Sequence, residues 1–95
     1  MNEAAILDRA NKAKAILDNP MYAQSFEMVR LAIIDRIEKC PLSETELAEN
    51  LRKCLKLLRD VRANLEATLN SGKVVQFHLA QEEAKRKNPL KGFFR

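Results

Sequence analysis

The sequence predicts an all-α protein built on an antiparallel helical hairpin, over about residues 20–39 and 44–70. A ladder of apolar residues at helical spacing, two short turn segments and a scarcity of Gly and Pro predict this class. Only two Gly and three Pro occur in 95 residues, and 46% of the residues are hydrophobic while 32% are charged. This composition is typical of long amphipathic helices. We expect one helical domain over residues 1–87, followed by a basic aromatic tail over 88–95.

The ladder lies in the second half of the predicted hairpin, where apolar positions follow one another in steps of four and three. It consists of Leu47, Leu51, Cys54, Leu58, Val61, Leu65 and Thr68. Heptad spacing places all seven on one seam of a single long helix, as in a coiled coil. An isolated helix cannot bury such a seam, so it must pack against its own chain or against copies of itself.

A flanking N-terminal helix is predicted over residues 3–18. Its apolar face consists of Ile6, Ala10, Ala13 and Leu17. Because these residues include few large anchors, we expect this helix to be stable only when docked. Asn19 and Pro20 suit the cap and the first position of the next helix, so the two helices should meet at a sharp corner.

The second helix is expected from Pro20 to about Lys39, with apolar residues over more than half of its circumference. One stripe consists of Tyr22, Phe26, Val29, Ile33 and Ile37. A second, rotated stripe consists of Met21, Met28, Leu31 and Ile34. Such a helix needs more than one packing partner. The third helix is one partner, and the other is the first helix or another subunit.

A short turn joins the two halves of the hairpin. Pro41 ends the second helix, and Ser43 with Glu46 has the spacing of a capping box. So short a connection between amphipathic helices favours an antiparallel pair.

The third helix is expected from Glu44 to about Asn70, with Ser71 and Gly72 as its C-terminal stop. It would measure about 40 Å against about 30 Å for the second helix. Its last turns should therefore overhang unless the first helix or another chain covers them. A short fourth helix is expected from Lys73 to about Lys87.

The residues expected to carry the packing or oligomer seam come from both halves of the hairpin. They are Phe26, Ile33, Leu51, Leu58, Val61 and Leu65.

The net charge of +4 is unevenly distributed. Residues 52–62 carry five basic side chains against one acid, Asp60. Those expected to contact nucleic acid or an acidic partner are Arg52, Lys53, Lys56 and Arg59. Such a surface would bind the phosphate backbone and be sensitive to salt. The alternative is an ordinary solvated helix face. A helix-turn-helix is disfavoured, because the helix continues without the turn that this motif needs.

The C-terminal tail ends in two adjacent aromatic residues between basic ones. A partner-docking role is expected for Lys91, Phe93, Phe94 and Arg95. Exposed Phe side chains are unfavourable in water, which favours a peptide that docks into a partner's groove. The alternative is that the two rings fold back and cover the end of the hairpin.

No constellation for catalysis or metal binding is present in the sequence. His78 is the single histidine, and Cys40 and Cys54 are far apart without a neighbouring histidine. Two packed thiols in a reducing compartment explain the cysteines. The two glycines cannot form a phosphate-binding loop. We therefore expect no catalytic residue, cofactor or metal, and no enzyme activity.

We expect neither a secretory signal nor a membrane-spanning segment in this sequence. The N-terminus lacks a basic region followed by an apolar core, and no apolar run approaches the length of a bilayer span. A cytoplasmic protein is expected, in the host cell's cytoplasm if the protein is viral.

The packing and cap residues over about 15–75 resemble small helical proteins of tailed phages and prophages. The resemblance rests on Leu17-Asp18-Asn19-Pro20, on the turn from Pro41 to Glu46, and on the leucine-rich pattern from Leu55 to Lys73. It implies a role among head and DNA-packaging proteins, with an architecture similar to the small terminase subunit. Many small terminases have an N-terminal helix-turn-helix that this chain lacks, so no residue is carried over as a site.

The expected function is that of a non-enzymatic, oligomeric phage assembly factor, in DNA packaging or head assembly. Its expected partners are copies of itself, with the packaging motor, head proteins or DNA as further candidates. One alternative is a regulatory module that binds nucleic acid through the basic residues of the third helix. Another is a small adaptor or inhibitor that binds a host protein.

Overall fold

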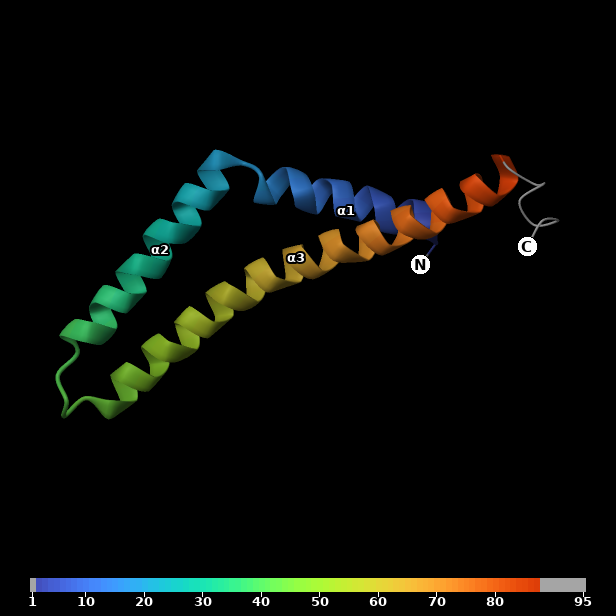
Figure 1. Cartoon of the computed structure of the whole chain (residues 1–95). Helices are drawn as coiled ribbons and strands as arrows, with labels where there is room; N and C mark the ends of the chain where they lie inside the picture. Colours follow the sequence, from blue (N-terminus) through green and yellow to red (C-terminus); the bar gives the residue numbers. More distant parts are fainter. Residues whose placement is uncertain (1, 88–95) are drawn as a thin grey trace.

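The computed structural model describes residues 2–87 and contains three helices. They are α1 (Glu3–Leu17), α2 (Pro20–Lys39) and α3 (Thr45–Lys87). No strand occurs within residues 2–87, so the all-α class is confirmed there. Figure 1 shows α1 and α2 following one another along α3, with both running antiparallel to it.

The boundary between α1 and α2 lies where the sequence predicts it. The Oδ1 of Asn2 accepts a hydrogen bond from the N–H of Ala5 at 2.8 Å and caps α1. The Oδ1 of Asn19 accepts one from the N–H of Met21, also at 2.8 Å, and caps α2 with Pro20 at its first position. Each cap satisfies a backbone donor that the helix itself leaves unpaired. Only Asp18 and Asn19 separate the helices, which produces the sharp corner in Figure 1.

The turn after α2 also lies where the sequence predicts it, but α3 begins one residue later than predicted. The carbonyl of Glu44 accepts the N–H of Ala48 at 3.1 Å, so Glu44 occupies the cap position. Ser43 is thereby displaced from the position that a capping box requires.

The predicted helix stop at Ser71 and Gly72 is wrong. α3 continues through both residues to Lys87, so the expected third and fourth helices are one helix of 43 residues. Gly72 does not have a positive φ, which a C-terminal glycine cap would need. A glycine inside a helix costs about 1 kcal/mol relative to alanine, a cost that packing can offset.

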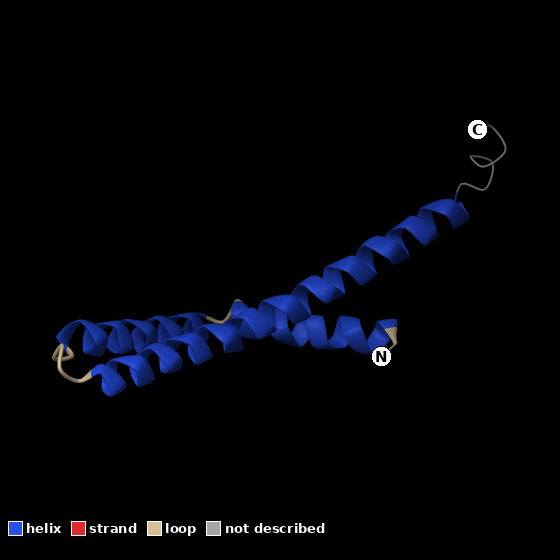
Figure 2. Cartoon of the chain, turned by 90° about the horizontal axis from the view of Figure 1, so that it is seen from below, coloured by secondary structure: helices blue, strands red, loops and turns tan. Residues whose placement is uncertain are grey.

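α1 packs against the C-terminal half of α3 and covers part of the predicted overhang. Its small residues Ala10 and Ala13 are buried, and Gly72 of α3 is buried against Ala10. Ile6 and Leu17 on the same face are half-buried, as their spacing predicts. Seen from below, the last turns of α3 extend past the start of α1 (Figure 2).

α2 packs against the N-terminal half of α3 with the stripe that contains Phe26. Phe26 is buried, and Tyr22, Ile33 and Ile37 are half-buried. The ring of Tyr22 lies 6.0 Å from that of Phe26, and the guanidinium of Arg62 sits 5.2 Å above the Phe26 ring. This cation–π contact places a charged, exposed residue of α3 at the edge of the seam.

The contacts within one chain use only part of the predicted ladder. The half-buried positions of α3 are Ala48, Leu51, Leu55, Leu58, Leu65, Thr68, Leu69 and Val75. Leu51, Leu58, Leu65 and Thr68 belong to the predicted ladder. The line of Leu47, Cys54 and Val61 is instead exposed, with Val61 58% exposed. The seam within the chain is therefore rotated towards Ala48 and Leu55.

The single chain is extended and has little core. Its radius of gyration is 21.4 Å, whereas a compact chain of this length would have about 12 Å. The hydrophobic residues buried within 2–87 are only Ala10, Ala13 and Phe26. Helical propensity, capping and partial burial hold the three helices together, and much apolar surface stays in contact with water.

Candidate functional site

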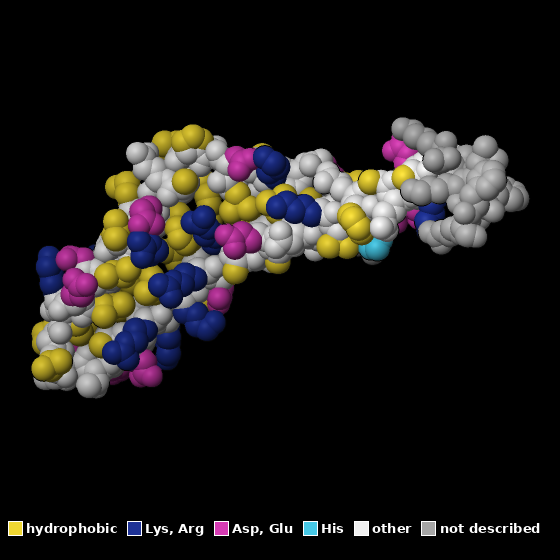
Figure 3. Space-filling model, viewed as in Figure 1, with side chains coloured by type: hydrophobic (Ala, Val, Ile, Leu, Met, Phe, Trp, Pro, Cys, Tyr) yellow, Lys and Arg dark blue, Asp and Glu magenta, His cyan; other side chains and the backbone are white. Residues whose placement is uncertain are grey.

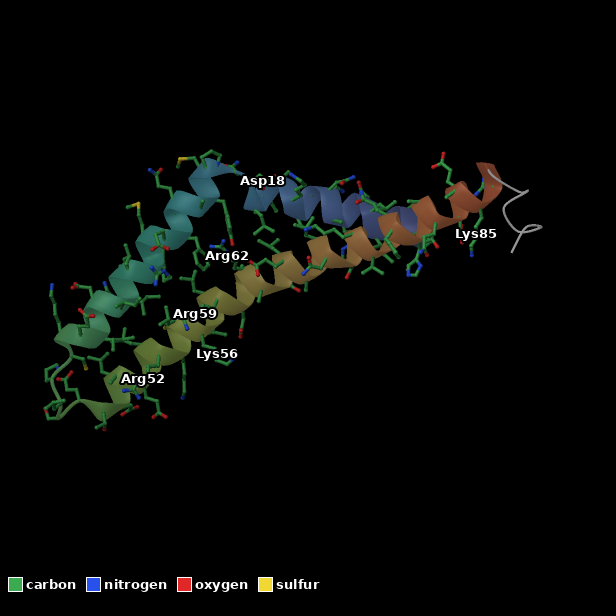
Figure 4. All side chains as sticks on the ribbon, viewed as in Figure 1. Asp18, Arg52, Lys56, Arg59, Arg62 and Lys85 are labelled. Carbon is green, nitrogen blue, oxygen red and sulfur yellow. The ribbon has the colours of Figure 1, made fainter. Side chains whose placement is uncertain are left out.

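Three of the predicted basic residues lie together on one side of α3. Arg52, Lys56 and Arg59 follow at steps of four and three, so they share a flank, and all three are exposed. We call these three residues the basic flank (Figure 4). Lys53 is exposed but is rotated by about 100° from Arg52, so it does not belong to this flank.

The basic flank is only partly neutralised by acidic neighbours. Lys56 Nζ lies 3.3 Å from Asp60 Oδ2, one turn further along α3. Arg62, which continues the row towards α2, pairs with Glu66 at 3.1 Å while it covers Phe26. Figure 3 shows Lys and Arg side chains gathered along this face of α3 and beside α2. The face could attract a polyanion, but it has no interleaved aromatic residue on which a base could stack.

A paired carboxylate on α2 lies at the edge of this basic face. Arg30 donates two hydrogen bonds to Glu27, of which the one from Nε to Oε2 measures 2.9 Å. These bonds lower the pKa of the Glu27 carboxyl from its ordinary value of 4.5, and the charges of Arg30 and Arg62 lower it further. Arg62, which contributes to this lowering, also lies over the ring of Phe26, the residue that precedes Glu27.

The second apolar stripe of α2 is exposed at three of its four residues, whereas Ile34 is half-buried. Met21, Met28 and Leu31 are 66%, 68% and 52% exposed. We call these three residues the outer face of α2, since they lie opposite the stripe that packs on α3. α1 does not cover them, so the first of the two partners considered for this stripe is excluded within the single chain.

A further apolar surface lies on α3 beside the contact with α2. Leu47, Leu57 and Val61 are 45%, 65% and 58% exposed, and Cys54 between them is exposed. We call these four residues the α3 stripe. The sequence identified three of them as part of the ladder, but only the structure shows that α2 leaves them uncovered.

The C-terminal turns of α3 add isolated apolar side chains. Val74 and Phe77 are 56% and 60% exposed, and the Phe77 ring lies 6.0 Å from that of His78. His78 is itself exposed. The predicted docking residues Lys91, Phe93, Phe94 and Arg95 lie outside the described residues.

A hollow of about 240 Å³ opens where α1 crosses α3. It is lined by Ile6, Arg9, Thr68 and Ser71. The Thr68 hydroxyl donates to the carbonyl of Asn64 at 2.9 Å, and the Ser71 hydroxyl to that of Ala67 at 3.0 Å. Both hydroxyl hydrogens are therefore already used within α3.

The remaining reactive side chains are dispersed. Cys40 is half-buried near the turn and Cys54 is exposed, and both are free thiols. Within residues 2–87, no three His, Cys, Asp or Glu side chains approach one another as a metal site would require. In the same range, no helix combines the length and the apolar character needed to cross a bilayer.

No protein-family model, curated protein or solved structure matches this chain. The resemblance to phage proteins therefore stays a prediction from sequence, and the surfaces themselves must carry any functional argument.

Proposed function

We propose that this protein is a non-enzymatic assembly module that forms homo-oligomers, with α2 and α3 acting as an antiparallel hairpin that is its building unit. The observation that carries the proposal is the amount of apolar surface along the two helices. Twelve large hydrophobic side chains of the described chain are exposed, and no side chain is fully buried. Contiguous apolar faces of this kind are typical of surfaces that bind other protein.

The exposed area supports the same conclusion. The accessible surface is 7882 Å², whereas a compact monomer of 10.9 kDa would expose about 5,600 Å². A stable protein interface covers about 800 Å² on each partner. The excess in this chain is more than twice that amount, so association could bury what folding alone leaves in water.

More specifically, we propose that this assembly module acts in phage DNA packaging or head assembly. It rests on the resemblance of the caps and packing residues to small phage proteins, among which ring-forming helical subunits occur. An extended helical chain with uncovered apolar faces suits such a ring, and the packaging motor or head proteins would then be further partners.

The decisive experiment is a mass measurement of the whole chain. We expect light scattering after size-exclusion chromatography to give a multiple of 10.9 kDa at micromolar concentration. A stable monomer at that concentration would exclude the assembly role and favour the adaptor alternative, in which a host protein covers the same faces.

Contact with nucleic acid is a second candidate function, favoured by the basic flank. Three exposed cations on one side of α3 could meet successive phosphates, while the apolar faces serve assembly. The two roles are compatible, because the basic flank and the α3 stripe lie on opposite sides of the line that packs against α2.

A further inference from the structure

We propose that the α3 stripe is covered by the same stripe of a second copy, so that two α2–α3 hairpins form an antiparallel four-helix bundle. This inference rests on the proposed self-assembly and specifies its interface. The outer face of α2 and the basic flank remain outside this bundle.

The first argument is the course of the apolar lines along α3. One line runs through Leu47, Cys54, Val61, Thr68 and Val75 at steps of seven residues. Its C-terminal members, Thr68 and Val75, are half-buried in the half of α3 against which α1 packs. Its N-terminal members are exposed, because α2 packs on the neighbouring line of Ala48 and Leu55. The exposed part of this line therefore continues a surface on which a helix packs, and α2 and α1 leave it uncovered within residues 2–87.

The second argument is that α2 adds to the same face. Glu27 follows Phe26 by one residue, as Lys56 of the basic flank follows Leu55 on the line that packs against α2. In an antiparallel helix pair, equal rotations from the contact line lead to the same side, so Glu27 lies on the side of the basic flank. Val29 follows Phe26 by three residues, a rotation of about 60° in the opposite sense. Val29 therefore lies on the side of the α3 stripe, and it is 47% exposed. A second hairpin placed there would contact both helices.

The third argument is charge complementarity, which selects one register. If Leu47, Cys54 and Val61 are a positions of the heptad, then Asn50, Leu57 and Asn64 are d positions. The exposed flanking g positions are Glu46, Lys53, Asp60 and Ala67. When Cys54 faces Leu57 of the second copy, Lys53 faces Asp60 of that copy, and the reciprocal pair forms as well.

The neighbouring register is electrostatically unfavourable. If the pairing shifted by one heptad, so that Cys54 faced Asn50, then Lys53 would face Lys53 and Glu46 would face Asp60 across the interface. Like charges in these flanking positions disfavour a pairing. Asp60 now makes a single exposed contact with Lys56, and Lys53 makes no ion pair within the described chain, so both are accessible to a second copy.

This bundle also explains why the sequence ladder and the packing of the single chain differ. Leu51, Leu58 and Leu65 face α2, while Leu47, Cys54 and Val61 face the second copy. All six then lie in one core between four helices. The heptad pattern describes the surface that assembly buries, of which one chain covers only a part.

The interface is tested with two lysine substitutions at exposed apolar positions. Val61→Lys lies in the α3 stripe, and Met28→Lys is its matched control on the outer face of α2. We expect Val61→Lys to lower the mass to a smaller species with its helical circular dichroism retained, and Met28→Lys to leave the mass unchanged. A wild-type oligomer that resists Val61→Lys, or that dissociates with Met28→Lys, would overturn this interface but not self-assembly. A monomeric wild type would overturn both.

The register is tested by disulfide trapping. In the proposed register Asn50 faces Val61 of the second copy, so Asn50→Cys/Val61→Cys, in a chain with Cys40→Ser and Cys54→Ser, should oxidise to a covalent dimer. Within one chain these positions are about 16 Å apart along α3, too far for a disulfide. Asn50→Cys alone, in the same background, should not crosslink. Absence of the covalent dimer from the double variant, with the oligomer still present, would overturn the register.

The charge pairing is tested by reversal. Lys53→Glu should weaken the dimer at low salt by at least several-fold in dissociation constant, because it opposes Asp60. The double variant Lys53→Glu/Asp60→Lys should restore the affinity, because the reversed charges attract again. If the double variant binds no better than the single one, the proposed pairing is wrong.

Discussion

Gly72 of α3 lies so close to Ala10 of α1 that a Cβ atom added to the glycine would stand 2.1 Å from the Cβ of Ala10. Carbon atoms in contact normally lie about 3.5–4.0 Å apart. The absent side chain of Gly72 is therefore what lets α1 approach α3. α1 has few large side chains to anchor it, so its docking depends on this close approach.

Gly72→Ala is expected to loosen α1. Alanine would gain about 1 kcal/mol of helix propensity, but overpacking costs about 1–3 kcal/mol. Because the clash involves a Cβ rather than the end of a flexible side chain, we expect a net loss of about 1 kcal/mol, concentrated in α1. Amide hydrogen exchange should accelerate in α1 and stay nearly unchanged in α2.

The matched control exchanges the two residues. In Ala10→Gly/Gly72→Ala the propensity changes cancel, and the new Cβ would lie 3.7 Å from the Cα of residue 10, an ordinary contact. The double variant should regain the slow exchange of α1. If it exchanges as fast as Gly72→Ala, close approach at this point is not what holds the helix.

Gly72 also shows which part of the fold sequence reasoning could not predict. The caps at Asn19 and Pro20 act locally, so the boundary between α1 and α2 follows from neighbouring residues alone. A glycine can end a helix or admit a neighbour, and the choice depends on a residue more than sixty positions away. The sequence favoured an end at Ser71 and Gly72, whereas α3 continues through both residues and Gly72 lies against Ala10.

Leu58→Asp is expected to disrupt the contact between α2 and α3. Leu58 is half-buried in this seam, and a carboxylate there would lose apolar contacts and lack a cation partner. We expect a loss of about 3 kcal/mol, seen as a lower melting temperature and a lower oligomer mass. Leu31→Asp, on the outer face of α2, should change stability by about 0.5 kcal/mol or less. Equal melting temperatures for Leu58→Asp and wild type would show that the seam does not support the fold.

The contact between α2 and α3 also shows which part of the candidate site could not be predicted from the sequence. Heptad spacing places Leu51, Leu58 and Leu65 on one line, and all three are half-buried in the structure. The line of Leu47 and the line of Ala48 both have the required spacing, and spacing alone cannot decide which one meets α2. Arg62 belongs to the line of Ala48, and a charged residue in a line argues against the burial of that line. The contact of Arg62 with the Phe26 ring removes this objection, but the sequence does not reveal that contact.

Neutralising the basic flank is expected to weaken any binding of DNA. Arg52→Gln/Lys56→Gln/Arg59→Gln should lower the affinity for duplex DNA in fluorescence anisotropy titrations at two salt concentrations. The slope of log affinity against log salt should fall by about 0.9 for each phosphate contact that is lost.

The control for this variant removes three other lysines. Lys12→Gln/Lys14→Gln/Lys39→Gln changes the net charge equally, but each of these lysines pairs with an acid four residues away in the sequence. It should bind nearly as wild type does. If wild type binds no DNA even at low salt, the basic flank is a solvated surface and the nucleic-acid role is excluded.

The pair of Glu27 and Arg30 predicts a dependence of stability on acid pH. Hydrogen bonds from Arg30 hold the pKa of Glu27 below 4.5 in the folded chain. The contribution of the Glu27 carboxylate to the free energy of unfolding is therefore complete above the pKa that Glu27 has in the unfolded chain. This contribution is lost as the pH falls through the lower pKa that Glu27 has in the folded chain. Glu27→Gln should be less stable than wild type in urea unfolding at pH 7. The two should converge at a pH below the folded pKa, and an equal difference at both pH values would contradict the role of this carboxylate.

Truncation after Lys87 distinguishes a tail that docks into a partner from a tail that contributes to the fold. All three helices end at or before Lys87, and the buried residues Ala10, Ala13 and Phe26 lie far from that end of the sequence. The shortened chain should therefore keep its circular dichroism and its melting temperature. It should lose a partner interaction in pull-downs if Phe93 and Phe94 dock outside the chain, and Phe93→Ser/Phe94→Ser in the full chain should reproduce that loss. A shortened chain that fails to fold would instead show that the two rings contribute to the core.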